Sequence, residues 1–576
     1  MADKIKLIPY GISDFKQIRK ENKYLVDKTM YFQKLEDAGN FLFLARPRRF
    51  GKSLFLSMLE AYYDVNDKDD FEQWFQGLYV DSHSTVYHNQ YLVLHLDFSL
   101  VGSDVERLEE NFNRYCDQEI NKFVEAHVKY FGQDKVEMIK NEHASIPKLN
   151  ALRSTAELLQ LPLYLIVDEY DNFTNNVLNV KGQQAYHDLT HGTGFYRDIF
   201  KIFKATFKRI IMLGVSPITL DDLTSGYNIA LNITMDERFN QMLGFSEEEV
   251  RQMIRYYKDA GAIKQSEEEI IADMKPWYDN YCFAEESFGR EPSVFNSDMV
   301  CYYLDSLVNK GKRPKEMLDA NTGTDYVKLQ RLVEIDQSKS KRISTIHKIV
   351  EDGYIIGQLV SHFPAERMME YGNFISLLYY YGMLTIGGVD WDMLKLVIPN
   401  NNVRKQYYNY LLQEYQSIDA LNLDDLKECF KFAARDGNWR PLIETICKAY
   451  HDTTSVRQLV EGERNLQGFM TAYLNLTNYY AVAPEQELNH GYCDFFLLPD
   501  IHAWLHASHS YILELKYLKA NATDAEARKQ WDDAVEQIKC YAQDEKLRSM
   551  LHGTTLHLVV VQIKGCDLVK YDEVIP

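Results

Sequence analysis

The sequence predicts an α/β fold with two sheets in separate domains, and three observations support this prediction. The chain has 576 residues, too many for one hydrophobic core, so two to four domains are expected. Before about residue 240, apolar runs such as 41–45 and 161–167 are continuous rather than alternating, which is typical of buried parallel strands. After about residue 455, a second and smaller pattern of helices and strands begins.

The apolar pattern divides the chain into four regions. The amphipathic stretches between the first strands are long enough for crossover helices, which predicts a parallel sheet covered by helices. Strand signals then become sparse, and Ser246 with Glu249 forms the capping box of a predicted amphipathic helix. The predicted regions, in chain order, are a core at 1–243, a helical lid at 244–400, a helical connector at 401–454 and a second α/β domain at 455–576.

The composition is that of a globular protein with no general attraction to polyanions. Hydrophobic residues make up 46% of the chain and charged residues 26%, which argues against disorder. The net charge of -20 draws the whole protein neither to nucleic acid nor to an anionic membrane. The eight cysteines lack zinc spacing and no apolar run approaches a membrane span, so we expect a cytoplasmic protein with reduced thiols. Self-association and a protein partner both stay open.

The stretch 41–56 has the order of a phosphate-binding loop. An apolar strand leads into a basic turn, then Gly51-Lys52-Ser53, then an apolar helix. In such a loop, backbone N–H groups surround the phosphates, the lysine neutralises them and the hydroxyl holds Mg²⁺. The alternative for a lone Gly-Lys-Ser is a basic helix N-terminus without a ligand. The candidate nucleotide-binding residues here are Arg49, Phe50, Gly51, Lys52, Ser53 and Leu54.

Two further strand ends carry polar residues that suit a nucleotide site. The strand at 161–167 ends in Asp168 and Glu169, which predicts a Mg²⁺ ligand followed by a general base for water. Two solvated acids at a strand end are the alternative. The strand beginning at Arg209 leads to Ser216, our candidate for sensing the γ-phosphate, although a simple Ser-Pro turn fits the sequence equally well.

The C-terminal region contains a candidate metal-dependent phosphodiesterase centre. Glu514 and Lys516 lie two apart in a predicted strand and therefore face the same side. Asp494 on a neighbouring strand completes a cluster in which two carboxylates bind Mg²⁺ and the lysine positions water. An exposed strand edge with paired charges is the alternative. The excess of acids over bases in this region argues against tight nucleic-acid binding through it alone.

Three histidines stand close together before the strand that carries Glu514. They are His502, His506 and His509. Their spacing fits no zinc pattern well, so a solvated loop between two strands is expected, with a metal site as the alternative.

Several segments together resemble the predicted AAA-ATPase-like family of bacterial, often Bacteroidetes-type, proteins, which carry a C-terminal PD-(D/E)xK nuclease-like domain. The segments are 8–29, 43–64, 164–172 and 214–229. The resemblance implies a P-loop NTPase-type sheet that binds ATP and Mg²⁺ through Lys52, Ser53, Asp168 and Glu169. The family's loop typically reads RPRRFGKS, so Arg46 agrees with it. The lid also matches, with Asn280 where the family usually has glycine, and the motif Val26–Thr29 matches without a known role.

The resemblance extends to the C-terminal region and implies a restriction-endonuclease-like fold. It adds Glu463 as a further metal carboxylate and places Gln537 beside the site. Tyr492 stands where the family often has arginine, which puts one phosphate contact in question. No arginine finger can be assigned, and Arg209 and Arg238 are only nearby candidates.

Two functions follow as expectations. In the first, an ATP-binding and ATP-hydrolysing module controls a Mg²⁺-dependent nuclease that acts on DNA or RNA. In the second, the ATPase is a regulatory switch, and the nuclease fold has lost catalysis and serves only for binding.

Overall fold

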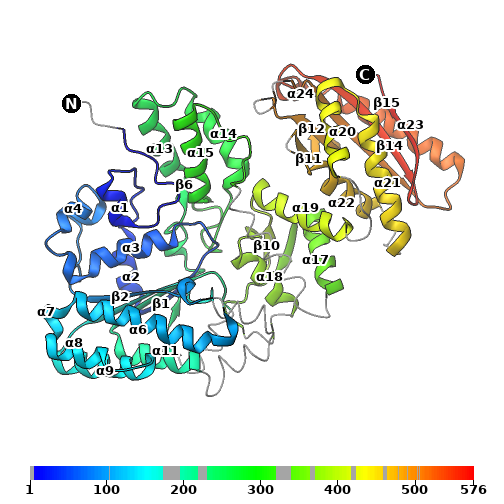
Figure 1. The fold of residues 1–576 in the computed structure, drawn as a ribbon. Helices are drawn as coiled ribbons and strands as arrows, with labels where there is room; N and C mark the ends of the chain where they lie inside the picture. The colour runs from blue at the N-terminus through cyan, green and yellow to red at the C-terminus, as the bar shows by residue number, and fades with distance from the viewer. Residues whose placement is uncertain are drawn as a thin grey trace. The chain divides into compact units, whose positions relative to one another are not determined.

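The computed structural model describes most of the chain and divides it into two compact units (Figure 1). The described residues are 5–102, 104–172, 195–217, 230–319, 339–363, 367, 370–416, 423–457, 463–477, 479–489, 491–501, 504 and 506–575. Some side chains within the helices, that of Glu463 among them, lie outside the description. The first unit contains the described parts of Met1–Asp319 and Tyr354–Val403, and the second contains those of Ser340–Gly353 and Arg404–Pro576.

The first unit is built on a five-stranded parallel sheet with the order β2-β3-β4-β1-β5. Its strands are β1 (Phe41–Ala45), β2 (Leu92–Asp97), β3 (Leu163–Asp168), β4 (Arg209–Gly214) and β5 (Leu231–Asn232). Nearly every residue of β1, β3 and β4 is buried, as the continuous apolar runs predicted. The predicted α/β fold with a parallel sheet is confirmed.

Helices cover both faces of this sheet. Figure 1 shows α3 (Lys52–Tyr63) on one side, and α6 (Leu108–Ala126), α9 (Ser145–Leu159) and α11 (Phe195–Thr206) on the other. The shorter helices of this region are α1 (Phe15–Lys20), α2 (Tyr31–Ala38), α4 (Phe71–Phe75), α5 (Tyr79–Ser82), α7 (Val128–Phe131) and α8 (Gln133–Lys140). None of the helices in the described part of the chain is long and apolar enough to span a membrane.

The region after the sheet contains the predicted helices and also strands. The helices α13 (Glu247–Asp259), α14 (Glu267–Tyr278) and α15 (Ser297–Lys310) pack around one apolar cluster, and Ser246 and Glu249 form the predicted capping box. A short ribbon of β6 (Phe245–Ser246) and β7 (Val294–Phe295) accompanies them. Further on, α18 (Tyr371–Tyr380) precedes an antiparallel sheet of β8 (Tyr354–Gly357), β9 (Thr385–Asp390) and β10 (Met393–Val397). That sheet was not anticipated, because its strands are short and Gly387-Gly388 weakens the strand pattern of β9.

The second unit contains a five-stranded sheet with the order β11-β12-β13-β14-β15. Only β13 and β14 are parallel. The strands are β11 (Tyr480–Leu488), β12 (Gly491–Pro499), β13 (His509–Leu518), β14 (Thr555–Lys564) and β15 (Asp567–Glu573). The helices are α17 (Lys339–Asp352), α19 (Asn401–Gln416), α20 (Leu423–Asp436), α21 (Arg440–Arg457), α22 (Glu463–Leu474), α23 (Asp524–Tyr541) and α24 (Glu545–Met550).

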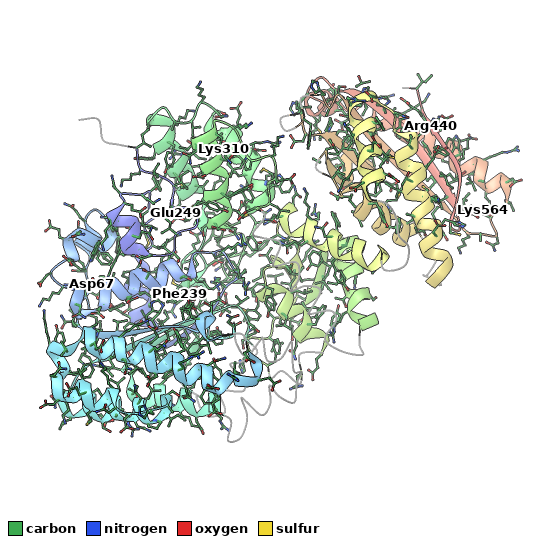
Figure 2. The ribbon with its side chains drawn as sticks, viewed as in Figure 1. Asp67, Phe239, Glu249, Lys310, Arg440 and Lys564 are labelled. Atoms are coloured by element: carbon green, nitrogen blue, oxygen red, sulfur yellow. The ribbon has the colours of Figure 1, made fainter. Side chains whose placement is uncertain are left out.

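Two helices of the predicted connector pack directly on this sheet. The hydroxyl of Tyr511 in β13 donates to the carbonyl of Ala433 in α20 at 2.8 Å. Arg440 in α21, labelled in Figure 2, forms an ion pair of 2.6 Å with Asp572 in β15. The helices α20 and α21 therefore belong structurally to the C-terminal domain.

Candidate functional site

A cavity of about 550 Å³ opens at the carboxyl ends of β1, β2 and β3 in the first unit. The residues after parallel strands converge at this edge of a sheet, where such folds bind ligands. Its polar wall includes Ser13, Lys28, Arg48, Arg49, Gly51, Lys52, Ser53, Asp97, Ser99, Asp168, Glu169, Asn172, Ser297 and Asp298. Its more apolar wall includes Pro9, Ile12, Tyr24, Leu25, Val26, Phe50, Leu54, Met242, Leu243, Phe245, Met253 and Cys301.

The loop after β1 has the backbone of an anion-binding turn. Arg49 has a φ of 69° and Gly51 a φ of 85°, so the turn uses the left-handed region twice. Gly51 is the N-cap of α3, and no side chain caps the first N–H groups of that helix. These N–H groups are therefore available to an anion in the cavity, which Gly51, Lys52, Ser53 and Leu54 all line.

Lys52 is buried and folds back onto its own loop. Its Nζ donates to the carbonyls of Arg46 and Pro47, both at 3.1 Å. These are neutral acceptors that a more negative ligand in the cavity can replace. The structure therefore places the ammonium group at the base of the loop, on the cavity wall.

Ser53 and Asp168, predicted from separate motifs, lie together. Ser53 Oγ donates to Asp168 Oδ2 at 2.5 Å. Burial is the main cause of a raised pKa of Asp168, and the neighbouring charge of Glu169 raises it further. The hydrogen bond from Ser53 opposes this shift. A buried carboxylate beside a hydroxyl is a pair that a cation would stabilise.

A second acid that sequence reasoning missed stands beside this pair. Asp97 ends β2, is in register with Asp168 of β3, and also lines the cavity. The signal was present, because the run 91–98 ends in Asp-Phe just as the next strand ends in Asp-Glu. Glu169 lines the cavity too, and its φ of 50° is a left-handed conformation that is uncommon outside glycine.

Ser216 lies after β4 but is not among the residues that line this cavity. It is fully buried, and its N–H donates to Asp171 Oδ2 at 2.7 Å, while its carbonyl accepts from the hydroxyl of Tyr170. The adjoining Gly214 leaves no room for a side chain, because a Cβ there would stand 2.2 Å from the Tyr170 ring. The structure thus does not bring Ser216 to the same wall as Lys52 and Ser53.

Arg46 does not face the cavity. Its guanidinium is 1% exposed, donates to the carbonyl of Thr234 at 2.6 Å and to that of Phe239 at 3.0 Å, and lies over the Phe283 ring at 4.2 Å. Burial lowers its pKa to about 10. Arg46 is thus part of the protein's interior.

The start of α15 covers the other side of the loop. Ser297 Oγ donates to the carbonyl of Arg49 at 3.2 Å, and Arg49 pairs with Asp298 and Asp319 at 3.4 and 3.5 Å. The ring of Phe50 packs edge-on against Tyr281 and Phe283. Arg49 and Phe50 thus line the cavity as predicted candidates while contacting the lid region.

The Val26–Thr29 motif now has a structural role. Asp27 Oδ1 accepts from the N–H and hydroxyl of Thr29 at 2.8 and 2.7 Å, which fixes the turn before α2. Lys28 Nζ donates to Glu249 Oε2 at 2.8 Å and to the carbonyl of Gln241 at 2.9 Å; Glu249 is labelled in Figure 2. The motif thereby holds the N-terminal wall of the cavity against α13.

Two of the remaining candidates in the first unit lie away from the cavity, and Asn280 forms a turn. Arg209 begins β4, at the end of the sheet opposite the cavity, and lies over Tyr87. Arg238 pairs with Asp236 on the surface. Asn280 has a φ of 76°, so asparagine does accept the left-handed turn that glycine would serve.

The second unit brings Asp494, Glu514 and Lys516 together. Lys516 Nζ donates to Glu514 Oε1 at 2.7 Å and to Gln537 Oε1 at 3.2 Å. Asp494 lies on β12 and accepts from the N–H of Leu515 at 2.7 Å, which sets it beside Glu514. Gln537, from α23, therefore does lie beside the cluster.

Glu514 is the most perturbed group of this cluster. It is 1% exposed, and its Oε2 has no hydrogen-bond partner among the described atoms. Burial, followed by the neighbouring charge of Asp494, raises its pKa to about 7, and Lys516 opposes this shift. An oxygen buried without a partner next to a second carboxylate fits a hard cation such as Mg²⁺.

Two predicted residues near this cluster, Glu463 and Tyr492, and one that was not predicted, Gln467, have different positions. Glu463 is the first residue of α22, and its side chain lies outside the described residues. One helical turn later, Gln467 donates from Nε2 to Asp494 Oδ1 at 2.8 Å, a contact that sequence reasoning missed. Tyr492 is 63% exposed, two residues before Asp494 on the same face of β12.

The histidines do not share one loop. His509 begins β13, and its Nδ1 lies 2.8 Å from Nε2 of His557, whose Nδ1 lies 2.7 Å from Glu573. Burial and the neighbouring His557 lower the pKa of His509. His506 is exposed, and His502 lies outside the described residues. The expected solvated loop is therefore wrong for His509, which the pairing of β13 with β14 holds in place.

Family models match two regions of the chain, one in each unit. Residues 9–224 match the model of a predicted AAA-ATPase family, and residues 461–573 match that of the PD-(D/E)XK nuclease superfamily. The "Uncharacterized protein in vnfD 5'region" of Azotobacter chroococcum mcd 1 is 26% identical over 295 residues, which are 49% of this chain and 50% of that protein. The match therefore spans half the length of that relative.

A structure of the Aeropyrum pernix ORC2 protein in ADPNP–ADP complexes can be aligned with this chain. The alignment covers 67% of this chain and 92% of the ORC2 chain. The identity is 9% and the TM-score 0.24, too low to support any argument. The family assignment rests on the two family models and on the motifs now located in the structure. Residues 9–224 of the chain belong to the predicted AAA-ATPase family, and residues 461–573 belong to the PD-(D/E)XK nuclease superfamily.

Proposed function

We propose that the first unit binds and hydrolyses ATP with Mg²⁺, and that this reaction controls a Mg²⁺-dependent nuclease centre in the second unit. The observation that carries the first half is the contact of Ser53 with Asp168 at the loop that holds Lys52. A hydroxyl and a carboxylate from the two motifs meet where a metal-bound triphosphate requires them.

The cavity suits a nucleotide in size and in the division of its walls. Its volume of about 550 Å³ lies within the usual range for small-molecule sites. The triphosphate lies against the loop and the first turn of α3, where N–H groups and Lys52 are available. The base lies against the apolar wall formed by Tyr24–Val26, Phe245 and Met253.

The acidic residues of the cavity have separate proposed roles. Ser53 and Asp168 would hold Mg²⁺, which neutralises phosphate charge in such sites, and Asp97 adds a negative charge beside them. Glu169 accepts a proton from the attacking water, because it follows Asp168 on the cavity wall. Its carboxylate is half-buried and reaches the cavity from a loop rather than from the strand.

Nucleotide binding and hydrolysis are tested separately. Wild-type protein is expected to gain thermal stability with Mg-ATP, and Lys52→Ala to lose most of this gain, whereas Lys201→Ala, which removes an exposed lysine on α11, retains it. Glu169→Gln is expected to bind ATP normally and to release phosphate at least a hundredfold more slowly. A wild-type protein without any nucleotide-dependent shift would refute the ATP assignment.

The nuclease centre is proposed from the carboxylate pair of the second unit. Asp494 and Glu514 would hold Mg²⁺, which polarises a phosphodiester and activates water in such centres. Lys516 keeps its ammonium group 2.7 Å from Glu514, where it orients the scissile phosphate or water. Gln537 holds Lys516 from α23. We expect cleavage of DNA or RNA with Mg²⁺ or Mn²⁺ that Glu514→Gln abolishes and the exposed α23 variant Glu536→Gln leaves unchanged.

Control of the nuclease by ATP is supported by contacts of the loop with the later part of the first unit. Pro47 packs on Gly382, where a Cβ would stand 2.8 Å from the proline, and Phe50 packs on Tyr281 and Phe283. From Gly382 the chain runs through β9 and β10 to Val403, where the first unit ends. A change in the loop therefore reaches the segment that leads into the second unit.

The coupling test compares cleavage with and without ATP. ATP is expected to change the cleavage rate of the wild type but not of Lys52→Ala. Equal ATP dependence in both proteins would refute control through this site.

A second candidate function is a regulatory switch whose nuclease fold only binds. The exposed Tyr492 favours it, because the outer part of β12 then offers an aromatic surface rather than a cation to phosphate. In that case no nucleic acid is cleaved by the wild type, and Glu514→Gln leaves binding of the partner unchanged.

A further inference from the structure

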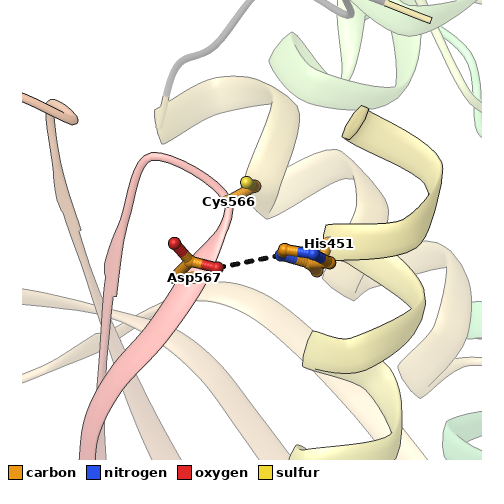
Figure 3. A group of neighbouring side chains, drawn as sticks. All are labelled: His451, Cys566 and Asp567. Carbon is orange, nitrogen blue, oxygen red and sulfur yellow. Dashed lines mark ion pairs between the residues drawn. The ribbon is translucent and has the colours of Figure 1, made fainter. Parts of the chain in front are cut away.

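A group of three side chains in the second unit lies outside both proposed sites. His451 of α21, Cys566 of the turn between β14 and β15, and Asp567 at the start of β15 bring one ligand atom each within 4.8 Å of one another (Figure 3). His451 Nδ1 forms an ion pair with Asp567 Oδ1 at 2.9 Å. In the described part of the chain, no other such group of histidine, cysteine and acidic residues occurs.

The turn that carries two of these residues has a defined shape. Lys564 and Asp567 are paired across the hairpin, so only Gly565 and Cys566 form its loop. Gly565 has a φ of 63°, and glycine at the first loop position is typical of a type II′ turn. The short loop presents the thiol of Cys566 and the carboxylate of Asp567 from adjacent positions at the end of the β14–β15 ladder.

The helix that carries His451 is held on the same sheet by contacts away from the group. Trp439 Nε1 donates to Glu573 Oε2 at 3.2 Å, and Arg440 pairs with Asp572 at 2.6 Å. These contacts lie near the start of α21, whereas His451 lies three turns further along it. The histidine is therefore brought to the hairpin by packing that does not depend on the group itself.

The ligand types select the class of cation. An imidazole nitrogen, a thiolate sulfur and a carboxylate oxygen suit Zn²⁺, which binds them at about 2.3 Å for sulfur and about 2.1 Å for nitrogen and oxygen. Mg²⁺ prefers oxygen ligands and suits the Asp494–Glu514 pair instead. In a tetrahedral site, bonds of these lengths set the ligand atoms about 3.3 to 3.7 Å apart, a small adjustment from the present spacing.

We propose that His451, Cys566 and Asp567 form a binding site for a divalent cation of the zinc class, with a fourth position open to water. The ion pair of His451 with Asp567 is replaced on binding by bonds from both residues to the metal, and the imidazolium of His451 and the thiol of Cys566 each release a proton to solvent. Bound metal ties α21 to the β14–β15 turn. All three groups are near the surface, so the cation can enter and leave without opening the fold.

Cobalt titration of the full chain tests this proposal, because thiolate ligation to Co²⁺ gives an absorption that carboxylate sites lack. The protein is freed of metal with a chelator, kept reduced, and titrated in excess Mg²⁺, which occupies carboxylate sites. We expect a thiolate-to-cobalt charge-transfer band that saturates at one equivalent and disappears on addition of Zn²⁺.

Matched variants locate the signal. Cys566→Ser is expected to abolish the band, His451→Ala to weaken Co²⁺ binding at least tenfold, and Cys540→Ser, which removes the exposed thiol of α23, to leave it unchanged. Circular dichroism checks that each variant is folded. A wild type without the band, or a band that survives Cys566→Ser or is lost in Cys540→Ser, would overturn the proposal.

Discussion

The hydroxyl of Ser53 donates a hydrogen bond to Asp168 with 2.5 Å between Oγ and Oδ2, although 115 positions separate the two residues. In this arrangement the hydroxyl hydrogen takes the place that a cation would hold between the same two oxygens. Because burial raises the pKa of Asp168, the ionised carboxylate gains from either partner.

Asp168→Asn therefore separates the role of the charge from that of the packing. The amide keeps the shape and can still accept from Ser53, but it is a poor Mg²⁺ ligand. We expect Mg²⁺ to tighten ATP binding to the wild type about 10-fold or more and to have little effect on the variant. Titration calorimetry with and without Mg²⁺ measures this, with the exposed Asp198→Asn as control. An equal Mg²⁺ effect in the variant would contradict the assignment.

Arg46→Gly would restore the glycine that general phosphate-binding loops carry at this position, yet we expect it to weaken the protein. The change removes hydrogen bonds to the carbonyls of Thr234 and Phe239 and leaves these acceptors buried without a donor. A loss of about 3 kcal/mol of unfolding free energy is expected.

Denaturant unfolding of the full chain, followed by tryptophan fluorescence, measures this loss. Arg238→Gly, at an exposed arginine paired with Asp236, should change stability by less than about 1 kcal/mol. Equal effects of the two substitutions would show that the buried contacts of Arg46 contribute little.

Gly214→Ala is expected to destabilise the end of β4. The new Cβ would stand 2.2 Å from the Tyr170 ring and 2.5 Å from Asp171 Oδ1. Tyr170 and Asp171, which follow Asp168 in the chain, must therefore shift. Overpacking of this kind costs about 1–3 kcal/mol. Gly372→Ala, where a Cβ meets nothing within 4 Å, is the matched control and should be close to neutral in a thermal melt. A neutral Gly214→Ala would contradict the packing described around Tyr170.

Glu514 gives the second unit a defined pH dependence. Its pKa is about 7 in the folded protein and 4.5 without the fold, so the folded state binds the proton more tightly. Below pH 4.5 the free energy of unfolding does not change with the titration of this group. It falls as the pH rises from 4.5 towards 7, and above pH 7 it stays about 3 kcal/mol lower.

Glu514→Gln should remove this dependence of stability on pH. The variant should be more stable than the wild type at pH 8, but not at pH 4.5. Urea unfolding at the two pH values checks the sign, with the exposed Glu536→Gln as control. In the wild type, Mg²⁺ binding should strengthen as the pH rises through 7, because the cation requires the ionised carboxylate. A variant that is less stable than the wild type at pH 8 would contradict the raised pKa.

Tyr492→Arg tests whether an arginine at this position strengthens the binding of nucleic acid. The side chain lies exposed on the face of β12 that carries Asp494, so an arginine there can reach a phosphate near the cluster. We expect binding of a DNA or RNA oligonucleotide to tighten several-fold and its salt dependence to steepen by about one counterion. Tyr492→Phe is the control. An unchanged salt slope in Tyr492→Arg would place the nucleic acid elsewhere.

The sequence predicted those parts of the sites that depend on neighbours along the chain. Gly51-Lys52-Ser53 and Asp168-Glu169 are short motifs where a strand ends or the next helix begins. Glu514 and Lys516 lie two apart within a strand, so strand geometry alone brings them to one face. The parallel sheet could also be predicted from the sequence, because its buried strands are continuous apolar runs.

What escaped prediction depends on contacts made by the fold. An arginine next to Gly-Lys-Ser resembles a surface cation until the carbonyls of Thr234 and Phe239 close around it. Ser216 follows the expected strand but is held by Asp171 away from the cavity wall. His451 and Cys566 have no informative spacing, because only the packing of α21 on the hairpin brings them together.

The way Arg46 is held determines which changes its surroundings can tolerate. Its hydrogen-bond acceptors at Ala45, Thr234 and Phe239 are all backbone carbonyls. The contact with Arg46 therefore depends on the path of the backbone, although the buried hydroxyl of Thr234 also accepts from the N–H of Ala45 at 2.9 Å. A one-residue insertion or deletion between 234 and 239 would move an acceptor away from a charge already buried. Homologues with this arginine are therefore expected to keep the length of that segment.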